Sequence, residues 1–251
     1  MTPPRSLATA LAMAPLIALG AFHTTASVAL RASPRAQGDW GVAYAPEDRA
    51  TRQPAIVFLH GMWASPEDSC EPFESAATPF GFLVCPRANA PMGDAGPGYM
   101  MWSGGYADAA RSIHAALDAA DALAPGKRAG QGGTLMGFSN GAYFAAEVAC
   151  SEPGRWSGLV LMSMKLDLDP KRLARAGVTR VLLAAGDRDE ARASMQDLAG
   201  RLNEHRPGDA APLEARYMSL GDVGHAFPSD MGARMCAAIA WVRGSMCHLS
   251  L

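Results

Sequence analysis

Residues 134–146 read Thr-Leu-Met-Gly-Phe-Ser-Asn-Gly-Ala-Tyr-Phe-Ala-Ala. This stretch predicts a short buried strand, a sharp turn that carries Ser139, and an apolar helix that begins at Asn140. A serine on such a turn projects its hydroxyl from the sheet edge, and the flanking glycines give the crowded turn the room it needs. The pentapeptide at 137–141 fits G-x-S-x-G, a pattern that also occurs by chance and gains weight from this strand and helix. The alternative is a tight glycine-rich turn with an idle serine.

Apolar runs of strand length alternate with helix-like segments along the rest of the chain. The runs show no polar alternation, which is typical of strands buried on both faces of a parallel sheet. We therefore predict an α/β fold: a mostly parallel, doubly wound sheet flanked by helices, in one domain without a large cap. Residues 30–38 are polar and are expected to form a short exposed lead-in. The predicted strands lie at 55–59, 82–85, 134–136, 159–162, 180–185 and 214–220, and the predicted helices at 66–77, 106–123, 140–150, 170–176, 190–205 and 229–242.

A serine hydroxyl is a poor nucleophile without a base, so the hypothesis needs a histidine late in the chain. His225 alone follows a late predicted strand, in the segment Gly-Asp-Val-Gly-His-Ala-Phe at 221–227. The glycine before it lets the loop fold tightly and bring the imidazole over the sheet edge. A surface loop histidine is the alternative interpretation. The remaining histidines lie in an early loop, in predicted helices or near a chain end: His23, His60, His114, His205 and His248.

The third member of such a set is an acid at the end of a strand between the serine and the histidine. Three carboxylates compete after the strand that ends at residue 185: Asp187, Asp189 and Glu190. The acid must reach the imidazole and fix its tautomer, and we favour Asp189 while the other two stay open. The chain order Ser139, Asp189, His225 is the one expected with a G-x-S-x-G turn.

A serine nucleophile also needs hydrogen-bond donors for the negative charge that develops on the attacked carbonyl oxygen. His60-Gly61-Met62-Trp63 comes where the first buried strand ends, and Gly61 permits a turn there. We expect the backbone N–H of Met62 to be one donor and the backbone N–H of Asn140 to be the other. His60 is then expected to be structural, hydrogen-bonded within its own loop.

The irregular stretch 87–105 is a long predicted loop and carries Tyr99 and Trp102. A loop of that length in a compact domain is usually functional or mobile. We expect Tyr99 and Trp102, together with Trp63 beside the oxyanion turn, to bind substrate. The alternative is that these side chains pack onto the core.

The first 29 residues differ in composition from the rest. Arg5 precedes an apolar stretch at 7–20, and Ser-Val-Ala at 27–29 fits the small-x-small cleavage rule. We predict a signal peptide at 1–29, a catalytic domain at 30–251, and a secreted or periplasmic protein with no stable membrane insertion after cleavage. An uncleaved anchor is the alternative; Pro15 and the polar residues at 23–25 weaken it.

Composition and cysteine content limit the partners, disulfides and cofactors that the chain can have. The chain of 251 residues is 49% hydrophobic with a net charge of −2, and no Lys/Arg run indicates a nucleic-acid partner. Closeness in sequence makes Cys70 with Cys85 and Cys236 with Cys247 plausible disulfides, with Cys150 left over, although spacing alone leaves the connectivity open. No C-x-x-C pair or histidine cluster indicates a metal, and we expect no cofactor.

Together these residues resemble the α/β-hydrolase family over roughly residues 40–243. The resemblance rests on His60-Gly61, the turn at 137–141, Gly186-x-x-Asp189 and Gly224-His225. It implies an eight-stranded, mostly parallel sheet and hydrolysis of an ester, thioester or amide through an acyl-enzyme. The turn at 137–141, with Gly-Phe-Leu-Val at 81–84, is similar to secreted polyhydroxybutyrate depolymerase-like and feruloyl-esterase-like proteins. Asn-Ala-Pro at 89–91 with Tyr99-x-x-Trp102 is similar to small carboxylesterases and thioesterases.

The function expected on this basis is hydrolysis of a carboxylic ester, small or polymeric, by a serine esterase with Ser139, Asp189 and His225 as its triad. A polyester depolymerase and a thioesterase or amide hydrolase are alternatives within the same fold. A non-catalytic relative that only binds a ligand is the alternative from a different class. Such a relative would most simply lack one of the three residues, and all three are present.

Overall fold

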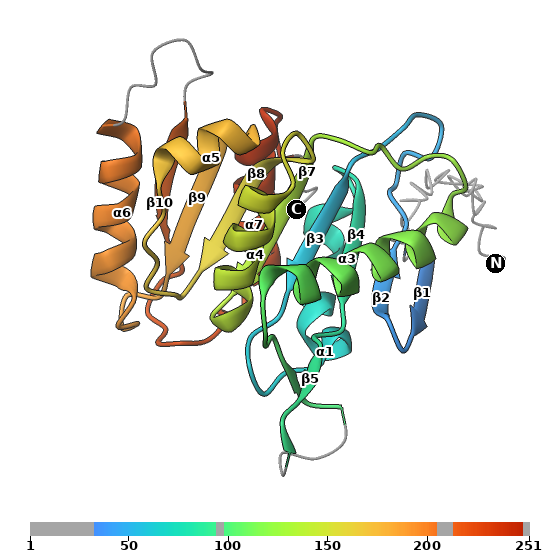
Figure 1. The fold of residues 1–251 in the computed structure, drawn as a ribbon, viewed down its shortest axis with the longest axis horizontal. Coiled ribbons are helices and arrows are strands. Elements are labelled where there is room, and N and C mark those ends of the chain that lie inside the picture. Colours follow the sequence, from blue (N-terminus) through green and yellow to red (C-terminus); the bar gives the residue numbers. More distant parts are fainter. Residues whose placement is uncertain (1–32, 94–97, 205–212, 248–251) are drawn as a thin grey trace, which may run out of the picture. The chain divides into compact units, whose positions relative to one another are not determined.

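The computed structural model describes residues 33–93, 98–204 and 213–247. The predicted signal peptide at 1–29 lies outside these residues. From Ser33 onward the chain forms one compact unit. Helices cover both faces of a central sheet in this unit (Figure 1).

The sheet has eight strands in the order β1-β2-β4-β3-β7-β8-β9-β10. From β4 to β10 all neighbours run parallel, whereas β2 is antiparallel to both β1 and β4. The predicted mostly parallel sheet is therefore confirmed. Its strands are β1 (Arg35–Gly38), β2 (Gly41–Tyr44), β3 (Ala55–Leu59), β4 (Phe82–Pro86), β7 (Gly133–Phe138), β8 (Trp156–Met162), β9 (Arg180–Ala185) and β10 (Glu214–Ser219).

Successive residues of each buried strand point to opposite faces of the sheet, and both faces are covered. Val57 and Leu59 of β3 pack into the core beneath α3, α4, α5 and α6. Ile56 and Phe58 pack into a second core with α1, α2 and α7. This double burial explains why the strand has no polar alternation. The helices are α1 (Pro66–Cys70), α2 (Glu74–Ala77), α3 (Tyr106–Ala120), α4 (Asn140–Ser151), α5 (Pro170–Ala176), α6 (Arg192–Glu204) and α7 (Met231–Arg243), with short 3₁₀ turns η1 (Glu71–Phe73) and η3 (Asp121–Leu123).

Two segments differ from the sequence prediction. Residues 35–38, expected as an exposed lead-in, form edge strand β1, which pairs with β2 and alternates between exposed and half-buried positions. An edge strand needs only one partner, so its polar sequence is compatible with pairing. Residues 66–77, predicted as one helix, divide into α1, η1 and α2. Pro72 lies in the 3₁₀ turn and has no N–H to continue the α-helical hydrogen bonds.

A small hairpin lies within the stretch predicted to be an irregular loop. Strand β5 (Ala90–Pro91) pairs antiparallel with β6 (Met100–Met101). The N–H of Met100 donates to the carbonyl of Ala64 at 3.2 Å, which ties the hairpin to the segment after β3. Figure 1 shows the hairpin projecting below the lower edge of the sheet.

Both disulfides that sequence spacing made plausible are present. Cys70–Cys85 joins α1 to β4, and Cys236–Cys247 joins α7 to the segment that follows it. Within the described residues Cys150 is free. None of the helices in this part of the chain is long and apolar enough to span a bilayer.

Candidate active site

Ser139 occupies the sharp turn between β7 and α4 that the sequence predicts. Its φ of 53° and ψ of −125° lie in a region that L-residues rarely adopt, and such strain is typical of functional turns. A Cβ on Gly137 would collide with the carbonyl of Gly141, and a Cβ on Gly141 would collide with the carbonyl of Leu59. Both glycines of the motif are therefore required by close packing. The Ser139 N–H donates to the carbonyl of Met162 at 2.9 Å and anchors the turn to β8.

Asp189 and His225 are in contact across two loops. The His225 Nδ1 lies 3.1 Å from Asp189 Oδ2, and the N–H of Ala191 donates to Asp189 Oδ1 at 2.8 Å. Gly186 brings the loops together, because a Cβ there would collide with the carbonyl of Val223. The strand β9, the glycine turn and the loop after β10 thus place the acid beside the imidazole.

The two competing carboxylates make different contacts. Asp187 Oδ1 accepts a hydrogen bond from the Ser219 hydroxyl at 2.7 Å. Glu190 is exposed and forms an ion pair with Lys165 at 3.2 Å. Of the three acids that the sequence left open, only Asp189 forms a hydrogen bond with the imidazole.

The environment of Asp189 favours its charged form. Burial raises the pKa of this carboxyl, but the Ala191 N–H, the Ser163 hydroxyl and the imidazole of His225 together lower it further. The net effect is a pKa below the ordinary value of 3.8. Asp189 therefore stays ionised at neutral pH and can accept a hydrogen bond from Nδ1–H of His225.

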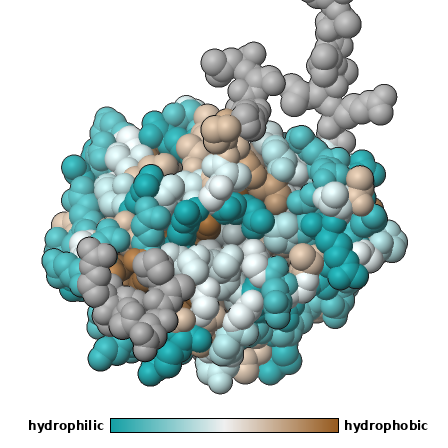
Figure 2. Space-filling model, turned by 90° about the horizontal axis from the view of Figure 1, so that it is seen from above, coloured by the Kyte–Doolittle hydropathy of each residue, from teal (hydrophilic) through white to brown (hydrophobic). Residues whose placement is uncertain are grey.

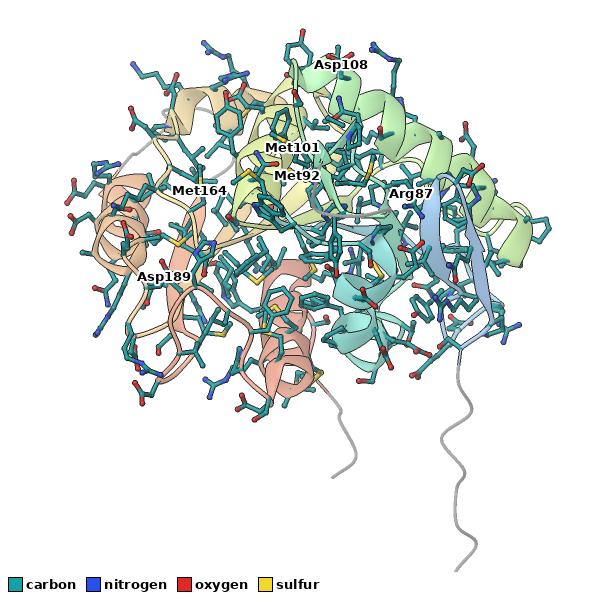
Figure 3. All side chains as sticks on the ribbon, turned by 90° about the horizontal axis from the view of Figure 1, so that it is seen from below. Arg87, Met92, Met101, Asp108, Met164 and Asp189 are labelled. Atoms are coloured by element: carbon teal, nitrogen blue, oxygen red, sulfur yellow. A yellow bond between two sulfur atoms is a disulfide. The ribbon has the colours of Figure 1, made fainter. Side chains whose placement is uncertain are left out.

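The ring of His225 is held next to the Ser139 turn by aromatic packing. Its centroid lies 4.9 Å from that of Phe138, the residue immediately before Ser139. Phe138 in turn packs edge-on against Phe227 at 4.7 Å. These contacts bring the late loop onto the turn that carries the serine. Figure 3 views this edge of the sheet and labels Asp189 near Met164, a residue of the loop after β8.

The segment after β3 lies directly against the Ser139 turn. A Cβ on Gly61 would come within 3.3 Å of the Ser139 Cβ, and Met62 is the next residue along this segment. Trp63 has a positive φ of 61°. His60 is buried and its Nδ1 contacts the Gly61 carbonyl at 2.8 Å, which is the loop hydrogen bond that the sequence led us to expect.

Trp102 differs from its expected place on the substrate surface. Its side chain is only 1% exposed, and its indole N–H donates to the His60 carbonyl at 3.0 Å. Its backbone N–H donates to Oδ1 of Asn140 at 2.9 Å. Trp102 therefore joins the segment after β3 to the start of α4 from inside the core. The structural role of the Asn140 side chain was missed, since this contact spans 38 positions and no local pattern signals it.

Trp63 and Tyr99 remain on the surface, where the sequence predicts them. They are 60% and 42% exposed. They come from the segments on either side of the bridge between Ala64 and Met100. The structure thus places Trp63 and Tyr99, but not Trp102, where a ligand can touch them.

A hollow of about 620 Å³ lies between the loops that follow β8 and β9. Its wall contains Asp189 and His225. The residues that line it are Ser163, Met164, Lys165, Arg188, Asp189, Glu190, Ala191 and His225. Within the described residues no three His, Cys, Asp or Glu side chains converge as metal ligands would.

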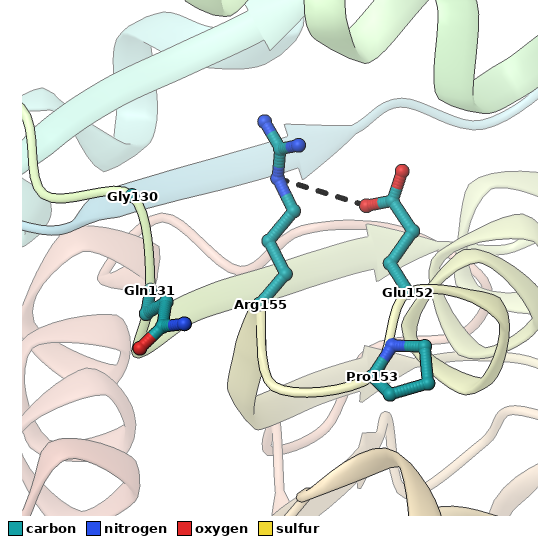
Figure 4. Close-up of a pocket in the computed structure, with 5 residues that line it drawn as sticks. All are labelled: Gly130, Gln131, Glu152, Pro153 and Arg155. Atoms are coloured by element: carbon teal, nitrogen blue, oxygen red, sulfur yellow. Dashed lines mark ion pairs between the residues drawn. The ribbon is translucent and has the colours of Figure 1, made fainter.

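A second hollow, of about 300 Å³, lies at the opposite edge of the sheet (Figure 4). It is lined by residues that precede β7 and β8, including Glu152 and Arg155, whose ion pair measures 3.7 Å. Figure 2 shows this edge as a mostly hydrophilic surface. This hollow lies at the amino ends of β7 and β8, whereas Ser139 follows β7 at its carboxyl end.

No protein-family model matches the chain, and no curated protein matches it by sequence. Solved structures do match. A carboxylesterase from Mesorhizobium loti has a TM-score of 0.55 at 20% identity, over 83% of this chain and 99% of that one. FphF, a fluorophosphonate-binding serine hydrolase of Staphylococcus aureus, has a TM-score of 0.57 at 13% identity, over 84% and 97%. The carboxylesterase of Bacillus cereus gives 0.55 at 16%, over 86% and 95%. At such identities the likeness concerns architecture, and the chain has the α/β-hydrolase fold.

Proposed function

We propose that this protein is a serine hydrolase that cleaves a carboxylic ester through an acyl-enzyme. The observation that carries the proposal is the contact between His225 Nδ1 and Asp189 Oδ2, next to a strained serine turn. Three groups in this order and setting match the division of labour among nucleophile, base and orienting acid.

In the proposed reaction, Ser139 Oγ attacks the ester carbonyl carbon while His225 Nε2 takes the hydroxyl proton. The backbone N–H groups of Met62 and Asn140 receive the developing oxyanion. The intermediate collapses, the alcohol leaves with the proton from His225, and an acyl-Ser139 ester remains. Water then loses a proton to His225 and attacks this ester; the second intermediate collapses, His225 returns that proton to Ser139 Oγ, and the carboxylic acid is released. Asp189 holds the tautomer of His225 throughout.

Two observations support an ester over other acyl compounds. The neighbours in the same fold include carboxylesterases, and no cap is inserted between Ser139 and Asp189, where the chain forms only α4, β8, α5 and β9. The exposed side chains of Trp63, two residues after the Gly61 that packs against the Ser139 turn, and of Tyr99 favour an apolar acyl or alcohol group. The same surface favours a polyester as the second candidate substrate.

We infer that the protein acts outside the cytoplasm. Two features support this location: the apolar segment and cleavage pattern within residues 1–29, and the two disulfides of the folded part. Disulfides persist mainly in oxidising compartments.

The test is a panel of p-nitrophenyl esters, from acetate to octanoate, beside thioester, anilide and polyester-film substrates. We expect ester hydrolysis that survives EDTA and falls on the order of 10⁶-fold in Ser139→Ala. Ester turnover retained at a tenth of wild type in Ser139→Ala would exclude this nucleophile. Faster turnover of the thioester or the anilide would show that the substrate is a thioester or an amide. Inactivity on the whole panel would support the ligand-binding alternative.

A further inference from the structure

Backbone strain gathers at one edge of the sheet. Among the described residues, three other than glycine have positive φ: Trp63 at 61°, Ser139 at 53° and Ser163 at 54°. Each follows a strand at its carboxyl end. Trp63 and Ser139 belong to the site already described, whereas the proposed mechanism gives Ser163 no task. Strain of this kind persists where the surrounding structure enforces it, and it concentrates at functional positions.

Ser163 relates to β8 as Ser139 relates to β7. Each serine directly follows its strand, and each N–H donates to the next strand along the sheet. Ser139 donates to the carbonyl of Met162 at 2.9 Å, and Ser163 donates to the carbonyl of Ala184 at 2.8 Å. Ser163 therefore lies one strand closer to Asp189 than Ser139 does. Ser163, Asp189 and His225 all line the same hollow.

The Ser163 side chain is buried and unsatisfied. It is 1% exposed, and its Oγ makes no hydrogen bond of ordinary geometry to another described residue. A buried hydroxyl without a partner is unfavourable, so it needs an acceptor within reach. The Asp189 carboxylate lines the same hollow as Ser163, and the Ser163 hydroxyl contributes to the lowered pKa of this carboxyl. Each carboxylate oxygen accepts more than one hydrogen bond, so the contacts with Ala191 and His225 leave room for a third.

We propose that Ser163 is a positioning residue, whose hydroxyl donates to the Asp189 carboxylate and fixes the orientation in which Oδ2 faces His225 Nδ1. The inference rests on the proposed function and adds a fourth residue to its machinery. Ser163 acts through Asp189 and has no contact with the reacting atoms. A carboxylate that is held by three donors keeps the imidazole in one tautomer, whereas one held by two can rotate.

The other charged groups around the Asp189 loop are engaged elsewhere. Lys165 pairs with Glu190 at 3.2 Å, and Arg188 pairs with Asp222 at 2.9 Å. Arg192 lies 3.9 Å from Asp187, and the Tyr217 hydroxyl donates to the Ala185 carbonyl at 3.1 Å. These side chains are half-buried or exposed, and none of them makes a hydrogen bond or ion pair to Asp189.

The test compares Ser163→Gly and Ser163→Ala with wild type. Glycine removes the hydroxyl and relieves the positive φ, whereas alanine removes the hydroxyl and keeps the strain. In both variants we expect kcat to fall about tenfold with KM within about twofold. We also expect the acidic limb of kcat/KM to move to higher pH, because a carboxylate with one donor fewer stabilises the imidazolium more. The melting temperature of Ser163→Gly should equal or exceed that of wild type.

A matched control and a readout independent of substrate complete the design. Ser194→Ala removes a nearby hydroxyl that donates to the Ala191 carbonyl at 3.2 Å, and it should leave kcat and the pH profile unchanged. The proton NMR signal of the His225 Nδ1–H, assigned by its loss in His225→Ala, should shift or broaden in Ser163→Gly. This signal reports the hydrogen bond between His225 and Asp189 even if the protein hydrolyses no ester. A failure of this inference can therefore be distinguished from a failure of the proposed function.

Two results would overturn the inference. An unchanged Nδ1–H signal in Ser163→Gly, with wild-type kcat and pH profile, would show that the hydroxyl is idle. A raised KM with wild-type kcat would show that Ser163 contacts substrate in the hollow instead of holding Asp189.

Discussion

The Asp189 carboxylate and the His225 imidazole meet at 3.1 Å although 36 positions separate them in sequence. The contact is asymmetric: the Asp189 side chain is 2% exposed and the His225 side chain is 52% exposed. The carboxylate is thus fixed inside the protein, while the imidazole reaches the surface.

Exchange of the buried acid for its amide tests this contact. Asp189→Asn should retain the fold and lower kcat by roughly 10⁴-fold, because the amide holds His225 in the wrong tautomer. Asp187→Asn is the matched control, since Asp187 accepts from Ser219 instead, and it should change kcat far less. Steady-state kinetics of both variants give the comparison, and the reverse ranking would assign the role to Asp187.

The buried His60 should make stability depend on pH. Burial lowers the pKa of His60 from its ordinary value of 6.5, so the folded protein binds a proton less readily than the unfolded chain. Stability from this residue is therefore full above pH 6.5 and declines as pH falls below it. His60→Asn keeps a donor near the Gly61 carbonyl but cannot be protonated. Between pH 7 and about pH 5, its free energy of unfolding should therefore fall by on the order of 1 kcal/mol less than that of wild type. Urea unfolding at the two pH values measures this, and parallel losses in both proteins would contradict it.

Truncation of Trp102 should act on the fold, whereas truncation of Tyr99 should act on the substrate. Trp102→Ala removes a fully buried indole and should cost about 3–5 kcal/mol of unfolding free energy. Tyr99→Ala removes an exposed ring and should change acyl-length preference with a stability change of about 0.5 kcal/mol or less. Denaturant unfolding and the ester panel separate the two effects. A Trp102→Ala protein that keeps its stability but changes its ester preference would instead show that Trp102 contacts the substrate.

The disulfide between α1 and β4 should contribute measurably to stability. Cys70 and Cys85 are 15 positions apart, and closing a loop of that size stabilises by about 3 kcal/mol. The double variant Cys70→Ser/Cys85→Ser should lose about that amount, and Cys150→Ser, which removes the free thiol, should lose little. Equal losses in the two proteins would indicate that the cross-link itself contributes nothing.

Sequence patterns predicted most of the fold because the signals there are local. The apolar runs at 55–59 and 180–185 match β3 and β9, since strands buried on both faces have no alternation to obscure them. Chain order and the glycine turn before Asp189 led to the acid that contacts His225. The roles of these residues in catalysis remain predictions.

What sequence could not predict depends on contacts between distant segments. The burial of Trp102 follows from its hydrogen bonds to His60 and Asn140, which lie 42 and 38 positions away. The strand at 35–38 forms only because β2 offers it an edge. No local pattern marks Ser163 in the sequence, because its positive φ and burial arise from the turn between β8 and the loop beside Asp189.

The most direct test of the central claim is covalent capture of the nucleophile. The native protein is treated with a fluorophosphonate, digested, and mapped by mass spectrometry, with Ser139→Ala and heat-unfolded protein as controls. We expect a single phosphonylated residue, Ser139, in the native protein, and no labelling in either control. A label on another serine, or no label on native protein that is otherwise folded, would contradict the assignment of Ser139 as an activated nucleophile.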